Sequence, residues 1–413
     1  MATTPQIPDQ GHILRMPNFR IIWLAQFVSI FGDFLALFGI ISFITFRLHG
    51  SPIQVTTVTV AYILPLAIFG PPTGVLVDHF DSRKTMIASD LIRGALILLL
   101  LVFHDVRQIA AVMFAISVVS CFFMPSQSVT VRTIVPKDRL LHATAALSQA
   151  FYIIRIASPL VAGAIVAAFS ERATFIIDAV SFGLSALLIS RLNFSRPPRE
   201  GADKSLRGLT RDFVEGNRFI FTHPGLSFVF IAMAVAMFVL SSFSPLISIF
   251  VRDQLHAGAM LFGIISGMVG VGLILGTSLI TRIVGKRPQP SVVLVGLLIT
   301  GVATSVLGVS YYGWEAAVSM FILGFAVSLV LIPAQTMSQQ ETPVEMAGRV
   351  SSTFMSMISI AQILGLLVSG TLAEKLGIRQ LFFSCTAFLI VIATAGWIYL
   401  RSRVPAPSVP ATE

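Results

Sequence analysis

The sequence has few charged residues, which occupy only 11% of its 413 positions, whereas apolar residues occupy 55%. A soluble globular protein carries about 25% charged residues. So little charge cannot cover the surface of a soluble protein of this size, and we expect the chain to lie in a lipid bilayer. The net charge of +9 favours membrane orientation over nucleic-acid binding, because the basic residues border apolar runs.

Cysteine and histidine are scarce as well. The two cysteines, Cys121 and Cys385, fall in separate apolar runs, where isolated thiols act as packing residues. The seven histidines are scattered, and the sequence contains neither an HExxH motif nor a phosphate-binding loop. We therefore expect no enzymatic activity, no metal and no cofactor. A membrane-embedded enzyme or a channel stays as a remote alternative.

Long apolar runs, by contrast, are abundant. Twelve of them, bounded by charges, proline or glycine, are long enough to cross a hydrocarbon core of about 30 Å. They cover residues 21–46, 53–77, 85–103, 108–130, 141–169, 173–192, 225–251, 258–281, 291–311, 316–338, 350–373 and 380–400. The sequence thus predicts an all-α polytopic membrane protein with twelve transmembrane helices in two six-helix bundles.

The two bundles are separated by the only long polar stretch. We expect an N-terminal bundle in residues 1–192, a cytoplasmic linker in 193–224, a C-terminal bundle in 225–401 and a cytoplasmic tail in 402–413. Within the linker, apolar residues share one helical face and bases occupy the others, which is typical of a helix lying on the membrane surface. A plain flexible tether is the alternative.

The basic residues also predict the orientation of the chain. With the N-terminus inside, 20 of the 28 lysines and arginines fall in cytoplasmic segments and six in outer loops. Cytoplasmic loops carry an excess of lysine and arginine. Both termini are therefore expected in the cytoplasm.

A short charged segment between the second and third apolar runs reads GPPTGVLVDHFDSRK, from Gly70 to Lys84. It strongly resembles the loop between helices 2 and 3 of the major facilitator superfamily. The resemblance implies that Gly70 and Gly74 let two helices meet closely. It also implies that Asp78, Arg83 and Lys84 latch the two halves together on the cytoplasmic side.

Other stretches resemble one branch of this superfamily, the drug–proton antiporters that include macrolide-efflux and enterobactin-export proteins. The resemblance rests on FRIIWLAQFVSIFGDFL in the first run and IIDAVSFGLSALL in the sixth, among others. It implies proton-coupled efflux of a small amphipathic substrate by alternating access around a central cavity, in a monomer of the bacterial inner membrane. An importer or a lysolipid flippase of the same fold stays open.

Three charged residues are expected at similar depth in the membrane. At 1.5 Å per residue, Asp33, Arg155 and Asp178 lie about 20, 22 and 21 Å from the inner surface. Ionisable groups in hydrocarbon are costly and are functional candidates by default. We hypothesise that Arg155 is shared by the two carboxylates and that Asp33 carries the coupled proton. A static salt bridge joining three helices is the alternative.

A second set of polar residues completes the candidates. Asp90 and Arg93 lie three residues apart, on one face of a helix, and are expected to pair with each other and with the charged turn near Asp78. The second half has no charge in its central spans, so amide and hydroxyl groups are expected there. The cavity-lining candidates are Gln26, Ser29, Gln335 and Gln362.

Overall fold

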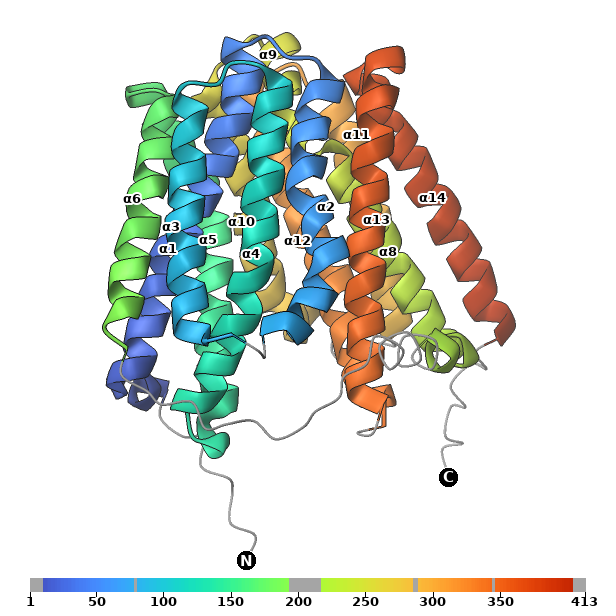
Figure 1. The fold of residues 1–413 in the computed structure, drawn as a ribbon. Helices are drawn as coiled ribbons and strands as arrows, with labels where there is room; N and C mark the ends of the chain where they lie inside the picture. The colour runs from blue at the N-terminus through green and yellow to red at the C-terminus, as the bar shows by residue number, and fades with distance from the viewer. Residues whose placement is uncertain (1–9, 78–79, 193–216, 285–288, 344–345, 404–413) are drawn as a thin grey trace, which may run out of the picture. The chain divides into compact units, whose positions relative to one another are not determined.

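The computed structural model describes residues 10–77, 80–192, 217–284, 289–343 and 346–403, and in these ranges the chain is helical without any strand (Figure 1). The long helices are α1 (Pro17–Ser42), α2 (Pro52–Leu76), α3 (Ser82–Leu98), α4 (Val106–Ile134), α5 (Leu140–Ala168), α6 (Glu171–Ser190), α8 (Pro224–Phe243), α10 (Ala259–Val284), α11 (Gln289–Val309), α12 (Gly313–Glu341), α13 (Ala347–Leu376) and α14 (Ile378–Arg403). The all-α prediction is confirmed.

Two of the helices continue through short turns. A π-helical turn, Phe43–Arg47, extends α1, and a 3-10 turn, Ser244–Leu246, joins α8 to the short helix α9 (Ile247–Asp253). Eleven helices in the described ranges are long and apolar enough to cross a membrane. The exception among the twelve long helices is α3, which has 17 residues and carries Asp90 and Arg93. The chain is therefore a multi-pass membrane protein, with one helix less apolar than the sequence pattern suggested.

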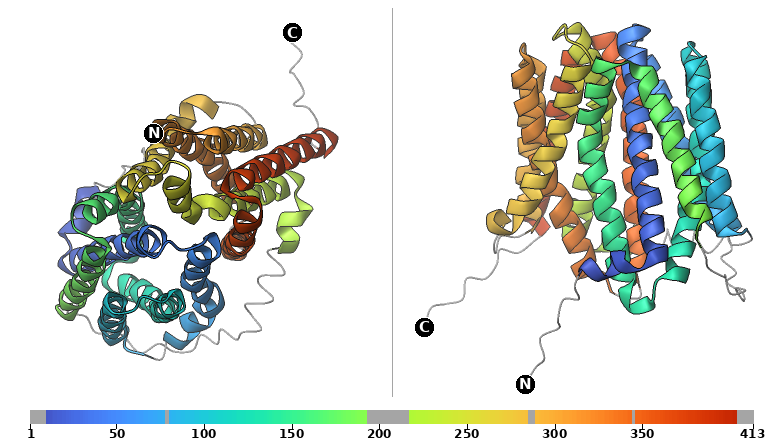
Figure 2. Two further views of the ribbon diagram at one scale, coloured as in Figure 1. Left: turned by 90° about the horizontal axis from the view of Figure 1, so that it is seen from above. Right: turned by 90° about the vertical axis from the view of Figure 1, so that its left-hand side faces the viewer.

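The chain forms two compact units, and the first comprises Met1–Phe43 and Ala61–Asp203. In this unit α1 packs against α5 and α6, and α3 packs against α4 and α6; Figure 2 shows the helices end-on. Close approach of α1 to α6 depends on Gly32 and Gly39, where an added Cβ would collide with Ser181 and Thr174 respectively. The packing of α6 thereby fixes the position of α1.

The second unit comprises Ile44–Val60 and Lys204–Glu413. Here α12 packs against α10 and α11, and α8 packs against α13. At Gly272 an added Cβ would collide with the backbone carbonyl of Phe321, and at Gly324 with that of Val269. These glycines serve packing between α10 and α12 inside one unit. Gly70, in contrast, has no described atom within 4 Å of an added Cβ, and the close crossing expected there stays a prediction.

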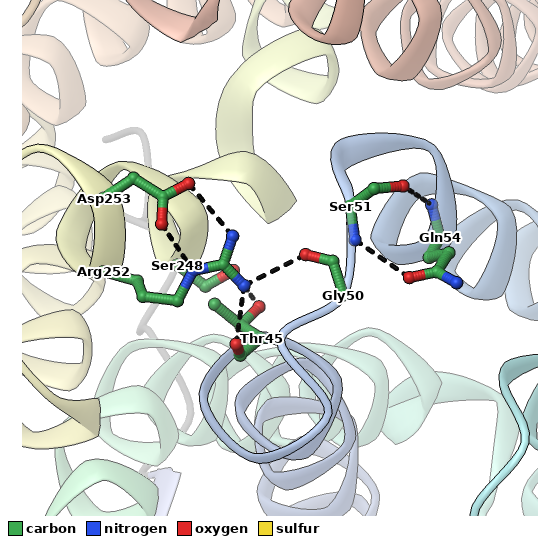
Figure 3. A network of polar contacts seen from close by, with 7 residues as sticks. All are labelled: Thr45, Gly50, Ser51, Gln54, Ser248, Arg252 and Asp253. Carbon is green, nitrogen blue, oxygen red and sulfur yellow. Dashed lines mark hydrogen bonds and ion pairs between the residues drawn. The ribbon is translucent and has the colours of Figure 1, made fainter.

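A polar network in the second unit ties the segment after α1 to α9 (Figure 3). The guanidinium of Arg252 donates hydrogen bonds to the carbonyl oxygens of Thr45 and Gly50, at 2.7 and 3.0 Å. Its other nitrogens bind the carboxylate of Asp253. The hydroxyl groups of Thr45 and Ser248 lie 2.8 Å apart. One arginine thus caps two backbone carbonyls of the turn between α1 and α2.

Candidate functional site

A buried ion-pair cluster occupies the interior of the first unit. Arg93 of α3 pairs with Asp90 on the same helix, as the three-residue spacing predicted, and its Nη1 lies 3.6 Å from Oδ2 of Asp33 on α1. The side chains of Arg93 and Asp90 are 4% and 0% exposed, whereas that of Asp33 is 21% exposed. Asp90 is therefore fully buried, and of these three residues Asp33 has the most accessible side chain.

Two aromatic rings hold the guanidinium of Arg93 in place. Its Cζ lies 4.7 Å from the ring centroid of Phe123 on α4 and 4.3 Å from that of Phe182 on α6. A cation over an aromatic face is attracted by the ring quadrupole, more strongly where water is excluded. The cation is thus fixed between α4 and α6, while Asp33 approaches it from α1.

Two further polar side chains belong to this cluster. Asp178 of α6 is 1% exposed and accepts a hydrogen bond from the Ser181 hydroxyl at 3.2 Å. It lies beside Gly32, since a Cβ there would also collide with the Asp178 carboxylate. The hydroxyl of Tyr62 on α2 lies within electrostatic range of the ionisable groups on α1, α3 and α6. Four helices therefore converge on one polar site.

The charges of the cluster do not balance. Three carboxylates, Asp33, Asp90 and Asp178, face a single guanidinium, that of Arg93. Uncompensated charge in a dry interior costs several kcal/mol or more, and a carboxylic acid avoids this cost by holding a proton. The arrangement can therefore store protons next to a fixed cation. Among the described residues, no group of three or more possible metal ligands occurs.

The predicted basic partner of Asp33 was wrong. Among the ion pairs of the described residues, none joins Arg155 to Asp33 or Asp178, and Arg93 takes the place expected for it. Arg155 is exposed on α5, and its electrostatic partner is Tyr152, three residues away on the same helix. Similar depth in the membrane did not mean contact, because the side chains leave their helices in different directions.

The charged turn is only partly described. Asp78 lies outside the described residues. Its expected pairing with Arg83, and with the ion pair of Asp90 and Arg93, therefore stays a prediction. Arg83 donates a hydrogen bond to the carbonyl oxygen of Ser190 at the end of α6.

The start of α3 beyond this turn is capped by Asp81, whose carboxylate accepts a hydrogen bond from the backbone N–H of Lys84 at 3.0 Å. The Lys84 side chain is exposed, and Gly74 lies near the end of α2. The described part of the turn thus anchors α3 to α6 within the first unit.

The four cavity-lining candidates have different surroundings. Gln26 accepts a hydrogen bond from the amide of Gln127 on α4, and Ser29 is buried. Gln335 is half-buried on α12, and Gln362 on α13 points its amide at the sulfur of Met237, 4.0 Å away. Among these four candidates in the described residues, Gln26 alone forms a strong polar contact with another helix, through Gln127.

Sequence reasoning missed three contributors to the cluster: Tyr62, Phe123 and Phe182. Tyr62 carried a usable signal, since a hydroxyl-bearing ring in the middle of an apolar run needs a polar partner. Phe123 carried none, because it is one of 33 phenylalanines. Phe182 lies in the IIDAVSFGLSALL stretch that carries the family resemblance, but only the fold shows that it meets Arg93.

Comparison with known proteins agrees with this architecture. The family model described as Major Facilitator Superfamily matches residues 22–365 and also residues 292–413. An uncharacterized MFS-type transporter, YfiS of Bacillus subtilis, is 29% identical over 379 residues, which cover 89% of each chain. Macrolide efflux protein A of Streptococcus pyogenes is 26% identical, covering 91% of this chain and 94% of that protein. The multidrug efflux pump Tap of Mycolicibacterium fortuitum is 24% identical over 86% of this chain and 89% of its own length.

Solved structures share the fold. The nucleoside transporter NupG superposes with a TM-score of 0.76 at 13% identity, covering 93% of this chain and 99% of that one. A bacterial homologue of the human lysosomal transporter Spinster gives a TM-score of 0.71 at 16% identity, covering 98% of this chain and all of that one. At this level of identity the likeness concerns the fold alone.

Proposed function

Because this chain belongs to the major facilitator superfamily, and is therefore a membrane transporter, we propose that it exports small amphipathic molecules in exchange for protons. The proposal places it in a bacterial inner membrane as a monomer, with both termini in the cytoplasm, working by alternating access. Relatives named as macrolide and multidrug efflux proteins support the direction of transport and a small-molecule substrate.

The observation that carries proton coupling is the excess of carboxylates over guanidinium in the first unit. Asp33 has the looser contact with Arg93, at 3.6 Å, and is the least buried of the three carboxylates. When ionised, Asp33 attracts Arg93 and draws α1 towards α3. When protonated, it loses that attraction, so one proton changes how firmly α1 is held. An equilibrium between two conformations responds to a ligand only through such a difference in interaction.

The other members of the cluster have supporting roles in this proposal. Asp90 keeps Arg93 charged and in place, and Asp178 and Tyr62 set the polarity around Asp33. We assign substrate contact to Arg155, Gln26, Gln335 and Gln362, with Ser29 leaving space beside Asp33. The charged turn, with Asp78, Arg83 and Lys84, is proposed to latch the cytoplasmic side.

The test is transport by the purified protein in proteoliposomes under an imposed pH gradient, with a panel of fluorescent amphiphiles. Asp33→Asn mimics a permanently protonated carboxylate, so gradient-driven transport should stop while substrate binding persists. Asp138→Asn is the matched control, because that carboxylate is exposed, with its side chain 77% accessible. Wild-type transport by Asp33→Asn would contradict the assignment and make Asp178 the next candidate. Accumulation in the opposite direction would indicate an importer, and lipid movement without a gradient a flippase.

A further inference from the structure

Arg155 stands out as a charged residue in the middle of the membrane without a carboxylate partner. It lies 15 residues after the start of α5 and 13 before its end, about 20 Å from either end at 1.5 Å per residue. No ion pair or hydrogen bond of Arg155 occurs within the described part of the chain. The residue has an exposed surface, although the surrounding protein is close enough to desolvate its guanidinium. An arginine in the membrane faces a water-filled space or an ionic partner rather than lipid.

The surface of α5 around Arg155 is polar. With 100° between successive residues, four exposed residues in the two turns up to Arg155 lie on one side of this helix: Ser148, Gln149, Tyr152 and Arg155. Nearer the start of α5, exposed Leu141 and Ala145 share that side. The exposed residues of the other side are apolar and suit lipid: Ile153, Ala157 and Leu160. An exposed polar stripe is unfavourable against hydrocarbon, so the Arg155 side of α5 borders water or substrate.

Aromatic rings connect this stripe to the proton-binding cluster. The ring centroids of Tyr152 and Phe151 lie 5.7 Å apart, and Phe151 lies 5.8 Å from Phe34, the residue after Asp33. All of these residues belong to the first unit. These rings meet edge to face, and an apolar body can pack against them while its charged end reaches the guanidinium.

From these contacts we propose that Arg155 binds the acidic group of an amphipathic organic anion, a carboxylate, sulfonate or phosphate, whose apolar body lies against Phe34, Phe151 and Tyr152. The guanidinium presents a planar fork of donors that matches such oxyanions. A lipid head group does not fit, because the site is too deep. This inference rests on the proposed transport function and specifies its substrate class.

The experiment compares two probes with the same fluorophore and opposite charge, dansylglycine and dansylcadaverine, binding to the full-length protein in detergent. We expect the parent protein to bind the anionic probe more tightly. Arg155→Gln should raise the Kd of the anionic probe at least about tenfold, which corresponds to about 1.4 kcal/mol. The Kd of the cationic probe should not change. Arg155→Lys should keep part of the affinity. Arg172→Gln is the control, since Arg172 is exposed at the start of α6.

Each outcome has a defined meaning. Equal or tighter binding of the cationic probe by the parent protein, or unchanged anion binding by a folded Arg155→Gln, overturns the inference. Absence of anion binding by the parent protein does the same. Binding at equilibrium needs no gradient, so anion binding that persists alongside gradient-independent transport would overturn the proposed proton coupling and leave this inference standing. Conversely, gradient-driven export of the cationic probe that is unchanged in Arg155→Gln would support proton coupling and overturn the inference of an anion site.

Discussion

Removal of the Arg93 guanidinium should strongly destabilise the first unit. In Arg93→Met, Asp33 and Asp90 lose the cation with which they pair, Asp178 loses a neighbouring positive charge, and two aromatic rings lose their cation–π partner. Removing one partner of a buried ion pair typically costs about 3–5 kcal/mol. A single pair at 3.6 Å accounts for about 4.6 kcal/mol of Coulomb attraction at an effective dielectric constant of 20. We therefore expect a loss of about 3–5 kcal/mol, because the surviving carboxylates reduce part of the cost by taking up protons.

Thermal unfolding in detergent, followed by intrinsic fluorescence, measures this effect. For a unit of about 200 residues, such a loss corresponds to a decrease in Tm of about 10 °C. The matched control is Arg155→Met, which removes the same group from the middle of another helix, where the residue is exposed and forms no ion pair with any residue that the structure describes. Its Tm should stay within about 2 °C.

A double variant separates lost pairing from lost packing. Asp90→Leu combined with Arg93→Met removes the buried ion pair of α3 and leaves Asp33 and Asp178 in place. Replacing a buried pair by apolar residues is often neutral or stabilising. The double variant should therefore recover much of the Tm lost in Arg93→Met. If Arg93→Met melts like the parent protein, or Arg155→Met is the more damaging of the two, the structural assignment of the cation is refuted.

Further predictions concern packing, the polar turn and topology. Gly272→Ala should cost about 1–3 kcal/mol, because the backbone at that contact cannot move aside, whereas Gly70→Ala meets nothing within 4 Å and should melt like the parent; equal Tm values would contradict the packing. Arg252→Gln should expose the turn between α1 and α2 to faster amide hydrogen exchange, since two carbonyls lose their donor; unchanged exchange would show that the turn is held by other contacts. Reporter fusions at Gln108 and Pro198 should report the outside and the cytoplasm respectively, and the opposite result at either site would overturn the orientation.

The fold was readable from sequence because hydrocarbon imposes a length on every crossing helix. The run predicted at 108–130 corresponds to Val106–Ile134, and that at 173–192 to Glu171–Ser190. The predicted and observed helix ends differ by only a few residues, because charges, proline and glycine mark the points where each apolar run stops. The pair of Asp90 and Arg93 was equally accessible, because a three-residue spacing fixes both height and direction on one helix.

The contacts between helices were less accessible. Counting residues gives the depth of Asp33 and Arg155 but not the direction in which each side chain leaves its helix, and that direction decides which cation Asp33 meets. The rotation of α1 is set by Gly32, which brings this helix against Asp178 and Ser181. Such a contact depends on three helices at once, and no local pattern records it.

The network around Arg252 has a consequence for how such proteins diverge. Its main acceptors are the backbone carbonyls of Thr45 and Gly50, and every residue type supplies a backbone carbonyl. Substitutions at these two positions can therefore accumulate without removing the acceptors, as long as the turn keeps its path. A contact of this kind produces no paired substitutions between its two segments, so methods that infer contacts from correlated sequence changes would overlook it. For the carbonyl contacts, only the arginine would be constrained, and its neighbour Asp253 would be the one partner visible in the sequence.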